Sequence, residues 1–405
     1  MFKKEFDKYF TLLSLYLAQS IPMSFFSTVV PVIMRMENYS LESIGYLQLI
    51  KLPWIAKFFW APFIDHTSHN LRQYRRWILG SEVFYAIVIV AIGFMNLQTD
   101  FITIVILMVI AFTASATQDI ATDAFAILSL KKEERSLGNS MQSAGNFLGT
   151  MVGSGVLLVI YHYYGWSNLL FGLAGLVLVA LIPVTLYKAP RDKTAHTSRK
   201  KVSWLDFAHF FNQKGIWRHV ILLLIFYAGI IGILTMLKPY LVDLGYSIKK
   251  IGFVVGIMGT GIGAVMTIPA GIYIRRKGLK RALYVLPVMN LVVAAYFTGL
   301  TYTSHPAFLV YLGIALLWAA YAMSSVFVYT LSMGVVRKGR EGTDFTVQIV
   351  LTHLSSLIVS VSSGKIADMI TYRGLFFLEV ILGVIIIILL YSLYSEKFYE
   401  RNEHS

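Results

Sequence analysis

Long apolar runs separated by short polar stretches dominate the pattern of this chain. A transmembrane helix needs about 20 mostly apolar residues, and the sequence contains twelve runs of that kind. We therefore predict an all-α polytopic membrane protein whose twelve transmembrane helices form two six-helix bundles. The predicted helices cover residues 9–34, 42–64, 77–96, 101–127, 137–162, 167–187, 217–241, 249–274, 280–301, 307–334, 345–369 and 373–395.

One long polar segment, residues 188–216, divides the predicted helices into two sets of six. It is basic at first and becomes amphipathic between Trp204 and Phe211. The other connections are short. We therefore expect an N-terminal bundle at 1–187 and a C-terminal bundle at 217–405, joined by this linker.

A short pattern recurs at the same place in both halves. The glycine of an Ile-Gly pair is followed 17 residues later by a proline, and a basic cluster comes next. This match indicates duplication of a six-helix unit, which is the layout of a secondary transporter built from parallel repeats. The two copies are Ile44 and Gly45 with Pro62, and Ile251 and Gly252 with Pro269.

The composition is typical of a membrane protein. Hydrophobic residues make up 57% of the chain and charged residues 14%, whereas a soluble domain has about 25% charged residues. Mean hydropathy is +0.67. The chain has no cysteine, which excludes disulfide and thiolate chemistry. The apolar stretch after "MFKKEFDKYF" is too long for a signal peptide and ends without a small-x-small motif, so we expect a first helix that is retained.

The net charge of +14 is explained by topology. Lys and Arg gather in alternate connections, which include both termini and the linker. Cytoplasmic loops carry such an excess, so we expect both termini and the linker on the cytoplasmic side. The same charges attract anionic lipid. No aromatic-and-basic RNA motif is visible, so we predict membrane lipid, and no nucleic acid, as a partner.

Two acids and a lysine are placed inside predicted membrane helices. Asp119 and Asp123 are four residues apart and share one helix face. Lys57, on the second helix, should lie at the same depth as Asp119 and pair with it. Asp123 beside such a pair would then be able to take up a proton, which would couple transport to a proton gradient. A static structural ion pair is the alternative.

An acid followed by three arginines lies at the cytoplasmic end of the second helix: Asp65, then Arg72, Arg75 and Arg76. This arrangement resembles the loop between helices 2 and 3 of the major facilitator superfamily. There, the acid faces the N-terminus of helix 11 and latches the inner gate, a position that favours an anion. The alternative is an acid that simply pairs with nearby arginines. The second half has Ile272 at the equivalent position, so the latch would be one-sided.

Two motifs in the first half carry a closer resemblance. "KFFWAPFID" at 57–65 and "QDIATDA" at 118–124 are similar to signatures of the AmpG-like muropeptide permease and acetyl-CoA transporter group, which also contains siderophore importers. The resemblance implies the major facilitator fold, proton-driven transport and a bacterial inner-membrane location. It points to a functional set made up of Lys57, Asp65, Gln118, Asp119 and Asp123.

The second half resembles a different branch of that group. Muropeptide permeases carry a Lys and an Asp around a glycine early in helix 7, where this chain reads "FYAGIIG" without charge. By contrast, "LKPYLVDLGYSIKKIG" at 237–252 and "EGTDFTVQ" at 341–348 resemble siderophore importers. We therefore expect an importer of a small polar or anionic solute, with a siderophore-type cargo first and a muropeptide as the alternative.

The resemblance also implies that helices 1, 4, 7 and 10 line a central cavity. Pro22 would bend the first helix there, although a plain packing kink explains it equally. Small residues on the fifth and eighth helices, from Gly145 to Gly153 and from Gly252 to Ala264, would let those two helices approach each other. The candidate cavity residues are Gln19, Ser20, Pro22, Lys51, Gln118, Lys238 and His353. For Lys238 the alternative is snorkelling, and for His353 it is a structural role.

A polytopic membrane enzyme, such as a lipid-linked transferase, is the alternative of another class. Such an enzyme usually needs a catalytic site in a soluble-facing region or metal ligands. The loops are short and no metal-spaced His/Asp/Glu cluster is visible, so we predict no enzyme activity, no metal and no cofactor. The expected partners are a small-molecule substrate, protons and lipid, and the expected state is a monomer.

Overall fold

The computed structural model describes residues 2–39, 47–187, 202–394 and 398–399. The predicted start of the second helix, the repeat pair at 44–45 and the basic part of the linker at 188–201 lie outside these ranges. Within them, eight helical stretches are long and apolar enough to cross a membrane. The chain is therefore a multi-pass, all-helical protein, as the hydrophobic pattern predicts.

Three of the eight stretches contain a break in left-handed backbone. The breaks are at Gly165 (φ 72°), Gly278 (φ 81°) and Thr371 (φ 65°). Each lies between two helices predicted from the sequence, so the breaks turn three long stretches into six membrane helices. Together with the interrupted second helix, the described residues account for twelve.

The N-terminal half contains the following elements: α1 (Phe2–Ser24), η1 (Phe25–Val29), α2 (Val30–Met36), η2 (Gln48–Lys51), α4 (Leu52–Ala56), η3 (Lys57–Phe59), α5 (Ala61–Thr67), α6 (Leu71–Gly93), α7 (Phe101–Ser129), η4 (Lys132–Glu134), α8 (Arg135–Met151), η5 (Val152–Val156), α9 (Leu157–Ala180) and α10 (Ile182–Leu186). The short elements from η2 to α5 make up the second membrane helix, whereas α8, η5 and the first part of α9 make up the fifth.

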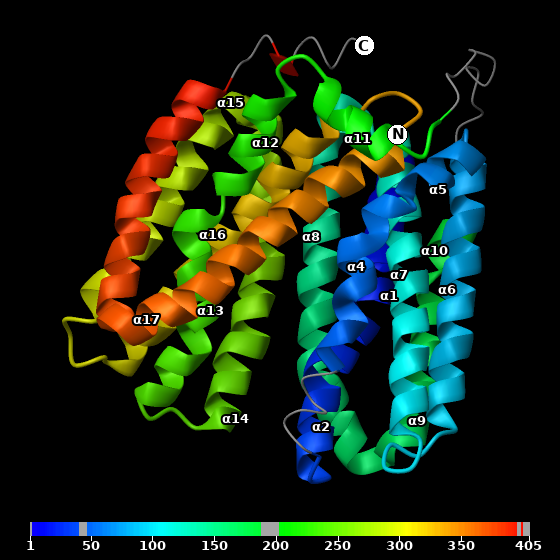
Figure 1. Ribbon diagram of the computed structural model, residues 1–405, viewed down its shortest axis with the longest axis horizontal. Coiled ribbons are helices and arrows are strands. Elements are labelled where there is room, and N and C mark those ends of the chain that lie inside the picture. Colours follow the sequence, from blue (N-terminus) through cyan, green and yellow to red (C-terminus); the bar gives the residue numbers. More distant parts are fainter. Residues whose placement is uncertain (1, 40–46, 188–201, 395–397, 400–405) are drawn as a thin grey trace. The chain divides into compact units, whose positions relative to one another are not determined.

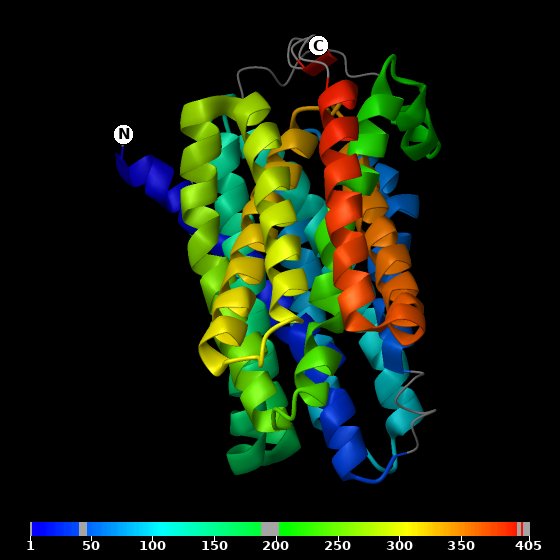
Figure 2. The ribbon, with the colours of Figure 1, turned by 90° about the vertical axis from the view of Figure 1, so that its left-hand side faces the viewer.

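The C-terminal half begins with the linker elements and continues with the remaining membrane helices. Its elements are α11 (Asp206–His209), η6 (Phe210–Asn212), α12 (Ile216–Ile225), α13 (Ala228–Asp243), α14 (Ile248–Ile251), η7 (Gly252–Gly259), α15 (Thr260–Leu300), α16 (Ala307–Met333) and α17 (Glu341–Leu393). Figure 2 shows that the chain reverses direction within α17, so this element provides two membrane helices.

The described residues form two compact units. The first lies within Met1–Lys132, Ala144–Ala208 and Arg337–Thr346, and the second lies within Glu133–Ser143, His209–Val336 and Val347–Ser405. Each unit thus includes one short segment from the other half of the sequence. The segment Arg337–Thr346 contains the turn before α17 and the first residues of that helix, and its place in the first unit is central to the site described below.

In the first unit, α6 packs against α7 and α9, and these three helices run side by side in Figure 1. Its core contains Phe26, Ile89 and Phe112. Pro22 is buried inside α1, and a π-helical segment, Phe25–Val29, follows it directly. Proline cannot donate the usual helical hydrogen bond, and irregular turns of this kind are frequent at kinks. The predicted irregularity in the first helix is therefore present.

In the second unit, α15 packs against α16 and α13. The aromatic rings of Phe226 and Phe327 stack with their centres 5.0 Å apart and hold α12 close to α16. Buried polar contacts also join helices of this unit: His219 Nε2 lies 2.6 Å from Gln348 Oε1, and Ser324 Oγ donates to Asn290 Oδ1 at 3.2 Å.

Candidate functional site

A buried ion pair joins the second and fourth membrane helices of the first unit. Lys57, on η3, is fully buried, and its Nζ donates a hydrogen bond to Asp119 Oδ2 on α7. The Nε2 of Gln19, on α1, donates to the other oxygen, Asp119 Oδ1, at 2.8 Å. Lys57 Nζ also lies 4.9 Å from the centre of the Trp54 ring. Burying a charge is tolerable only when partners compensate it, and these side chains provide that compensation.

The irregular second helix explains how Lys57 reaches this position. Pro53 and Pro62 each lie in the first turn of a short helix, because proline lacks the N–H that a helix interior requires. Between them the backbone tightens into a 3₁₀ turn at Lys57–Phe59, where the N–H of Trp60 bonds to the carbonyl of Lys57 at 3.2 Å. The sequence "KLPWIAKFFWAPFID" therefore folds as linked short helices, and the lysine is at the junction.

Asp123 lies one turn after Asp119 on the same face of α7, as their spacing predicts, but it has a different partner. Its carboxylate is buried and accepts a hydrogen bond from the Tyr16 hydroxyl at 2.6 Å. Asp119 thus faces a cation and an amide, whereas Asp123 receives this bond from a neutral phenol.

Two buried amide oxygens lie next to these acids. Gln118 is fully buried, and its Nε2 donates to Thr122 Oγ1 at 2.9 Å. In the part of the chain that the structure describes, Gln118 Oε1 and Gln19 Oε1 have no hydrogen-bond partner. Buried acceptors are normally satisfied, so these two oxygens mark a place where a water molecule, a proton donor or a polar group of the cargo would bind favourably.

Asp65 is the third buried acid of the site, and it accepts four hydrogen bonds. Tyr74 Oη donates at 2.7 Å, Gly342 N at 2.9 Å, Thr343 N at 2.7 Å and Thr343 Oγ1 at 2.6 Å. Gly342 and Thr343 are in the first turn of α17, where backbone N–H groups have no partner within the helix. Asp65 therefore faces the N-terminus of the eleventh membrane helix, the arrangement that the resemblance implies for a latch.

The first turn of α17 has little space next to Asp65. A Cβ on Gly342 would lie 2.8 Å from Asp65 Oδ1 and 2.9 Å from Ile120 Cγ2. A side chain at position 342 would therefore displace the Asp65 carboxylate or the Ile120 side chain.

The three arginines after Asp65 point elsewhere. Arg75 Nη1 donates to the carbonyl of Tyr187 at 3.1 Å, and Arg72 and Arg76 are exposed. The hydrogen bonds described for Asp65 come from Tyr74, Gly342 and Thr343, so the geometry matches the latch better than the simple arginine pairing.

A second ion pair stabilises the same turn before α17, and the sequence analysis did not find it. Arg337 binds the buried Asp344 through two hydrogen bonds, from Nε to Oδ2 at 2.8 Å and from Nη2 to Oδ1 at 2.6 Å. The signal was present in "RKGREGTD", where two acids follow three basic residues at the start of a membrane helix.

The remaining candidate cavity residues have other surroundings. Ser20 Oγ donates to Asn146 Oδ1 on α8 at 2.6 Å, and Lys51, at the end of η2, is half-buried. Lys238 on α13 and His353 on α17 belong to the second unit, and both are exposed.

The expected glycine contact between the fifth and eighth helices is wrong in its details. The glycines of α8 and η5 face α1 instead: a Cβ on Gly149 would lie 2.5 Å from Ser20 Cβ, and one on Gly153 would lie 2.3 Å from the Ile21 carbonyl oxygen. The eighth helix meets the fifth at other residues, where Ser140 Oγ donates to the Thr267 carbonyl at 2.6 Å. Helical periodicity correctly grouped the small residues on one face but assigned the wrong neighbour to it.

Two further buried acids were overlooked. Both carboxylate oxygens of Glu82 on α6, and Oε2 of Glu379 on α17, have no hydrogen-bond partner within the described ranges. Each is an acidic residue within a predicted membrane helix, and that alone marks a functional candidate in a membrane protein.

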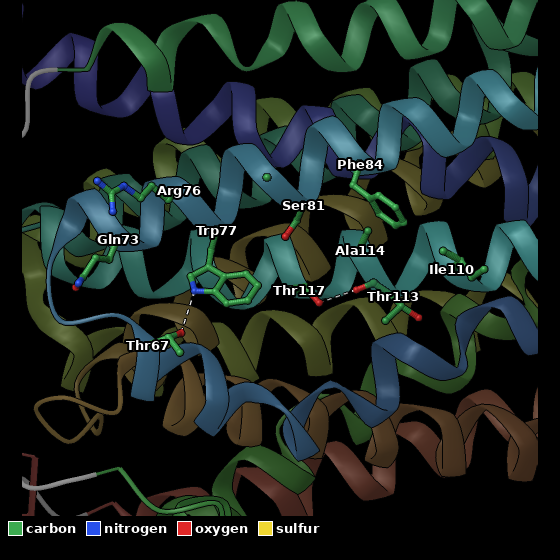
Figure 3. Close-up of a pocket in the computed structure, with 11 residues that line it drawn as sticks. Thr67, Gln73, Arg76, Trp77, Ser81, Phe84, Ile110, Thr113, Ala114 and Thr117 are labelled. Atoms are coloured by element: carbon green, nitrogen blue, oxygen red, sulfur yellow. Dashed lines mark hydrogen bonds between the residues drawn. The ribbon is translucent and has the colours of Figure 1, made fainter.

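A separate cavity of about 680 Å³ opens beside α6 and α7 (Figure 3). Trp77 crosses it and donates from Nε1 to Thr67 Oγ1 at 3.0 Å. Its lining includes Arg76 but none of the residues of the buried ion pair. Arg76, which the sequence analysis assigned to the gate, therefore borders this cavity.

The chain is similar in sequence to several bacterial transport proteins. The chain is 26% identical to the "Anhydromuropeptide permease" of Escherichia coli (strain K12) over 286 residues, which cover 69% of this chain but only 58% of that protein. It is 25% identical to "Putative transporter AmpG 3" of Rickettsia prowazekii (strain Madrid E) over 430 residues, which cover 99% of both chains.

The fold is also shared with solved structures. A bacterial homologue of the iron transporter ferroportin, solved in an outward-facing state, superposes with a TM-score of 0.72. The match covers 96% of this chain and 99% of that one at 14% identity, so it demonstrates a common fold and nothing about the cargo.

The chain also matches a whole family of proteins. Residues 10–358, most of the chain, match the Major Facilitator Superfamily. The described membrane helices agree with this assignment, which also makes the protein a transporter and not the lipid-linked transferase considered above. The chain therefore belongs to the Major Facilitator Superfamily of secondary transporters.

Proposed function

We propose that this protein is a proton-coupled importer of anhydromuropeptide-type cell-wall fragments in a bacterial inner membrane. The names of its relatives support a muropeptide cargo over the siderophore cargo that the second half of the sequence favours. Anhydromuropeptides are sugar–peptides that carry carboxylates, so they fit the polar or anionic solute class expected from the sequence. In this proposal both termini lie in the cytoplasm.

The buried cluster of Lys57, Asp119 and Asp123 carries the proton-coupling part of the proposal. Asp119 is compensated by a lysine. Asp123, one turn further along α7, is buried and accepts a hydrogen bond from the Tyr16 hydroxyl. Burial penalises a carboxylate more than a neutral carboxyl group. Binding of a proton by Asp123 would therefore shift the conformational equilibrium toward the state that favours the neutral carboxyl group.

The cargo-binding part rests on the unsatisfied polar groups near the same cluster. Gln19 Oε1 and Gln118 Oε1 are buried acceptors on α1 and α7. Amide and hydroxyl groups of a sugar–peptide are suitable donors for them. Since "FYAGIIG", at the junction of α12 and α13, carries no charge, we expect these groups of the first unit to contribute most of the polar recognition.

We also propose that Asp65 acts as a latch of the inner gate. Its four hydrogen bonds from Tyr74 and the first turn of α17 stabilise the latched arrangement. Inward release of cargo would require the two hydrogen bonds from backbone N–H groups to break.

Uptake into proteoliposomes tests the function. Purified protein should accumulate a radiolabelled anhydromuropeptide when an inward proton gradient is imposed, and a protonophore should abolish accumulation. A ferric siderophore, tested in parallel, should not accumulate. Accumulation of the siderophore alone would refute the cargo, and gradient-independent accumulation of the muropeptide would refute the coupling.

Variants of the acids test the assignment of the site. Asp123→Asn should retain exchange of cargo across the membrane but lose accumulation driven by the gradient. Asp100→Asn is a matched control, because Asp100 is the N-cap residue at the opposite end of α7. Full gradient-driven accumulation by Asp123→Asn would exclude that residue as the coupling site.

A further inference from the structure

The amphipathic part of the linker folds into a short, self-capped segment. Within residues 203–207, Asp206 Oδ2 accepts from the backbone N–H of Ser203 at 2.7 Å, and Ser203 Oγ accepts from the N–H of Leu205 at 3.3 Å. We call Ser203–Phe207 the strap. It belongs to the first unit, and neither the transport mechanism nor the family resemblance assigns it a role.

The apolar side of the strap covers the second membrane helix. Trp204 stacks on Phe63 with ring centres 5.7 Å apart and planes inclined by only 14°. Phe207 packs edge-on against Phe58 and Phe59, with ring centres 5.6 Å and 5.9 Å away. Phe58 is adjacent to Lys57 in the sequence and Phe63 lies two residues before Asp65, so the strap covers the stretch that carries both functional side chains.

The polar side of the strap binds the turn before α17. Asp206 is buried, and its Oδ2 lies 3.2 Å from Arg340 Nε. Its main-chain carbonyl accepts from Arg337 Nη2 at 2.8 Å. Arg337 is the residue that also binds Asp344, so one guanidinium joins the strap to the first turn of α17.

We infer that the strap is a component of the inner gate, which holds the turn before α17 in the position that lets Asp65 capture the helix N-terminus. Asp65 binds residues 342 and 343, and Asp206 binds residues 337 and 340. The two acids thus hold the same ten-residue segment, Arg337–Thr346. Asp206 is a positioning residue, because it acts on the latch through Arg337 and Arg340.

This inference relies on the proposed latch at Asp65 but not on the identity of the cargo. Loss of the strap contacts should increase the fraction of molecules with an open latch, even without substrate. The strap also provides a route by which changes in the central linker would alter transport, because the linker and the latch share one turn of the chain.

Thiol labelling measures latch opening directly. The natural chain has no cysteine, so Ile120→Cys introduces a single reporter thiol, at a fully buried residue that faces Gly342. The labelling rate with a maleimide in detergent or liposomes then reports how often residues 337–346 move away. Asp65→Asn in this background is the positive control and should raise the rate.

In the reporter background, Asp206→Asn should raise the labelling rate roughly tenfold or more, the factor expected when one charge-assisted hydrogen bond is lost. Trp204→Ala with Phe207→Ala should raise it as well. Leu205→Ala is the matched control, because Leu205 lies in the strap but is exposed, and should leave the rate unchanged.

A charge exchange distinguishes a specific contact from a general loss of folding. Asp206→Arg alone should raise the labelling rate, and adding Arg340→Asp should return it toward the parent value. If Asp65→Asn opens the latch but Asp206→Asn does not, or if the charge exchange gives no rescue, the strap has no gating role. If Asp65→Asn itself has no effect, the latch proposal fails together with this inference, while the uptake assay above still tests the cargo.

Discussion

Removing one partner of the buried Lys57–Asp119 pair should destabilise the protein far more than removing both. Lys57→Met leaves the Asp119 carboxylate with Gln19 as its remaining described donor, in a place where the carboxylate side chain is only 6% exposed. An uncompensated buried charge of this kind costs about 3–5 kcal/mol. Asp119→Asn leaves the lysine without its counter-charge and should cost a similar amount. The double variant contains neither charge, and the side-chain amide introduced at position 119 would still accept from Gln19.

The expected magnitudes give a clear outcome for a double-mutant cycle. The two single variants add up to about 6–10 kcal/mol, whereas replacing a buried pair with neutral groups is often close to neutral. The interaction energy should therefore exceed about 3 kcal/mol, the upper end for residues in contact.

Thermal unfolding in detergent is the assay. For a chain of this size, extension of the usual scaling gives about 1–2 °C in Tm per kcal/mol, so each single variant should unfold about 3–10 °C below the parent. The double variant should be more stable than either single one. Lys238→Met controls for loss of a lysine in general, since Lys238 is exposed on α13, and should change stability by less than about 0.5 kcal/mol. A double variant whose loss equals the sum of the two single losses would show that Lys57 and Asp119 do not stabilise each other.

Three further substitutions, at Asp65, Gly342 and Gly153, test the latch and the packing of α1 against η5. Asp65→Asn weakens hydrogen bonds to an ionised acceptor, worth about 1.5–3 kcal/mol each, so cargo exchange without a gradient should become faster; an unchanged exchange rate would argue against a latch. Gly342→Ala should also speed up cargo exchange although Asp65 is intact, because the new Cβ would lie 2.8 Å from the Asp65 carboxylate. Gly80→Ala is the control and should not change the exchange rate, because no atom lies within 4 Å of the new Cβ. Gly153→Ala should lower stability by about 1–3 kcal/mol through overpacking against the α1 backbone, and Gly172→Ala should be neutral or stabilising in the same unfolding assay.

The strap and the Asp65 latch together should make gate opening more cooperative than the latch would alone. Asp65 holds the first turn of α17 by hydrogen bonds to its backbone groups, and Arg337 and Arg340 join the preceding turn to Asp206. Because these contacts share one segment of chain, they should form and break together. Such cooperation makes the latched and open states discrete, which an alternating-access transporter requires.

The membrane helices could be predicted from the sequence because the bilayer imposes a strong condition on it. Every backbone polar group must be satisfied within a helix, and each helix needs a run of apolar residues. The breaks at Gly165, Gly278 and Thr371 fell between predicted helices for the same reason. The pairing of Lys57 with Asp119 was also accessible, since two buried opposite charges at one depth have few other partners.

The partners of the gate could not be derived in that way. Arg337 contacts Asp206 across 131 residues of sequence, and Arg340 does so across a similar span, while many acids and arginines near the cytoplasmic surface have equally suitable charge. The glycines of α8 failed for a related reason: a helical period shows which residues share a face but not which helix covers it. Hydrophobicity acts on each segment separately and can be read locally, whereas a hydrogen bond depends on atomic distances that only the packed helices determine.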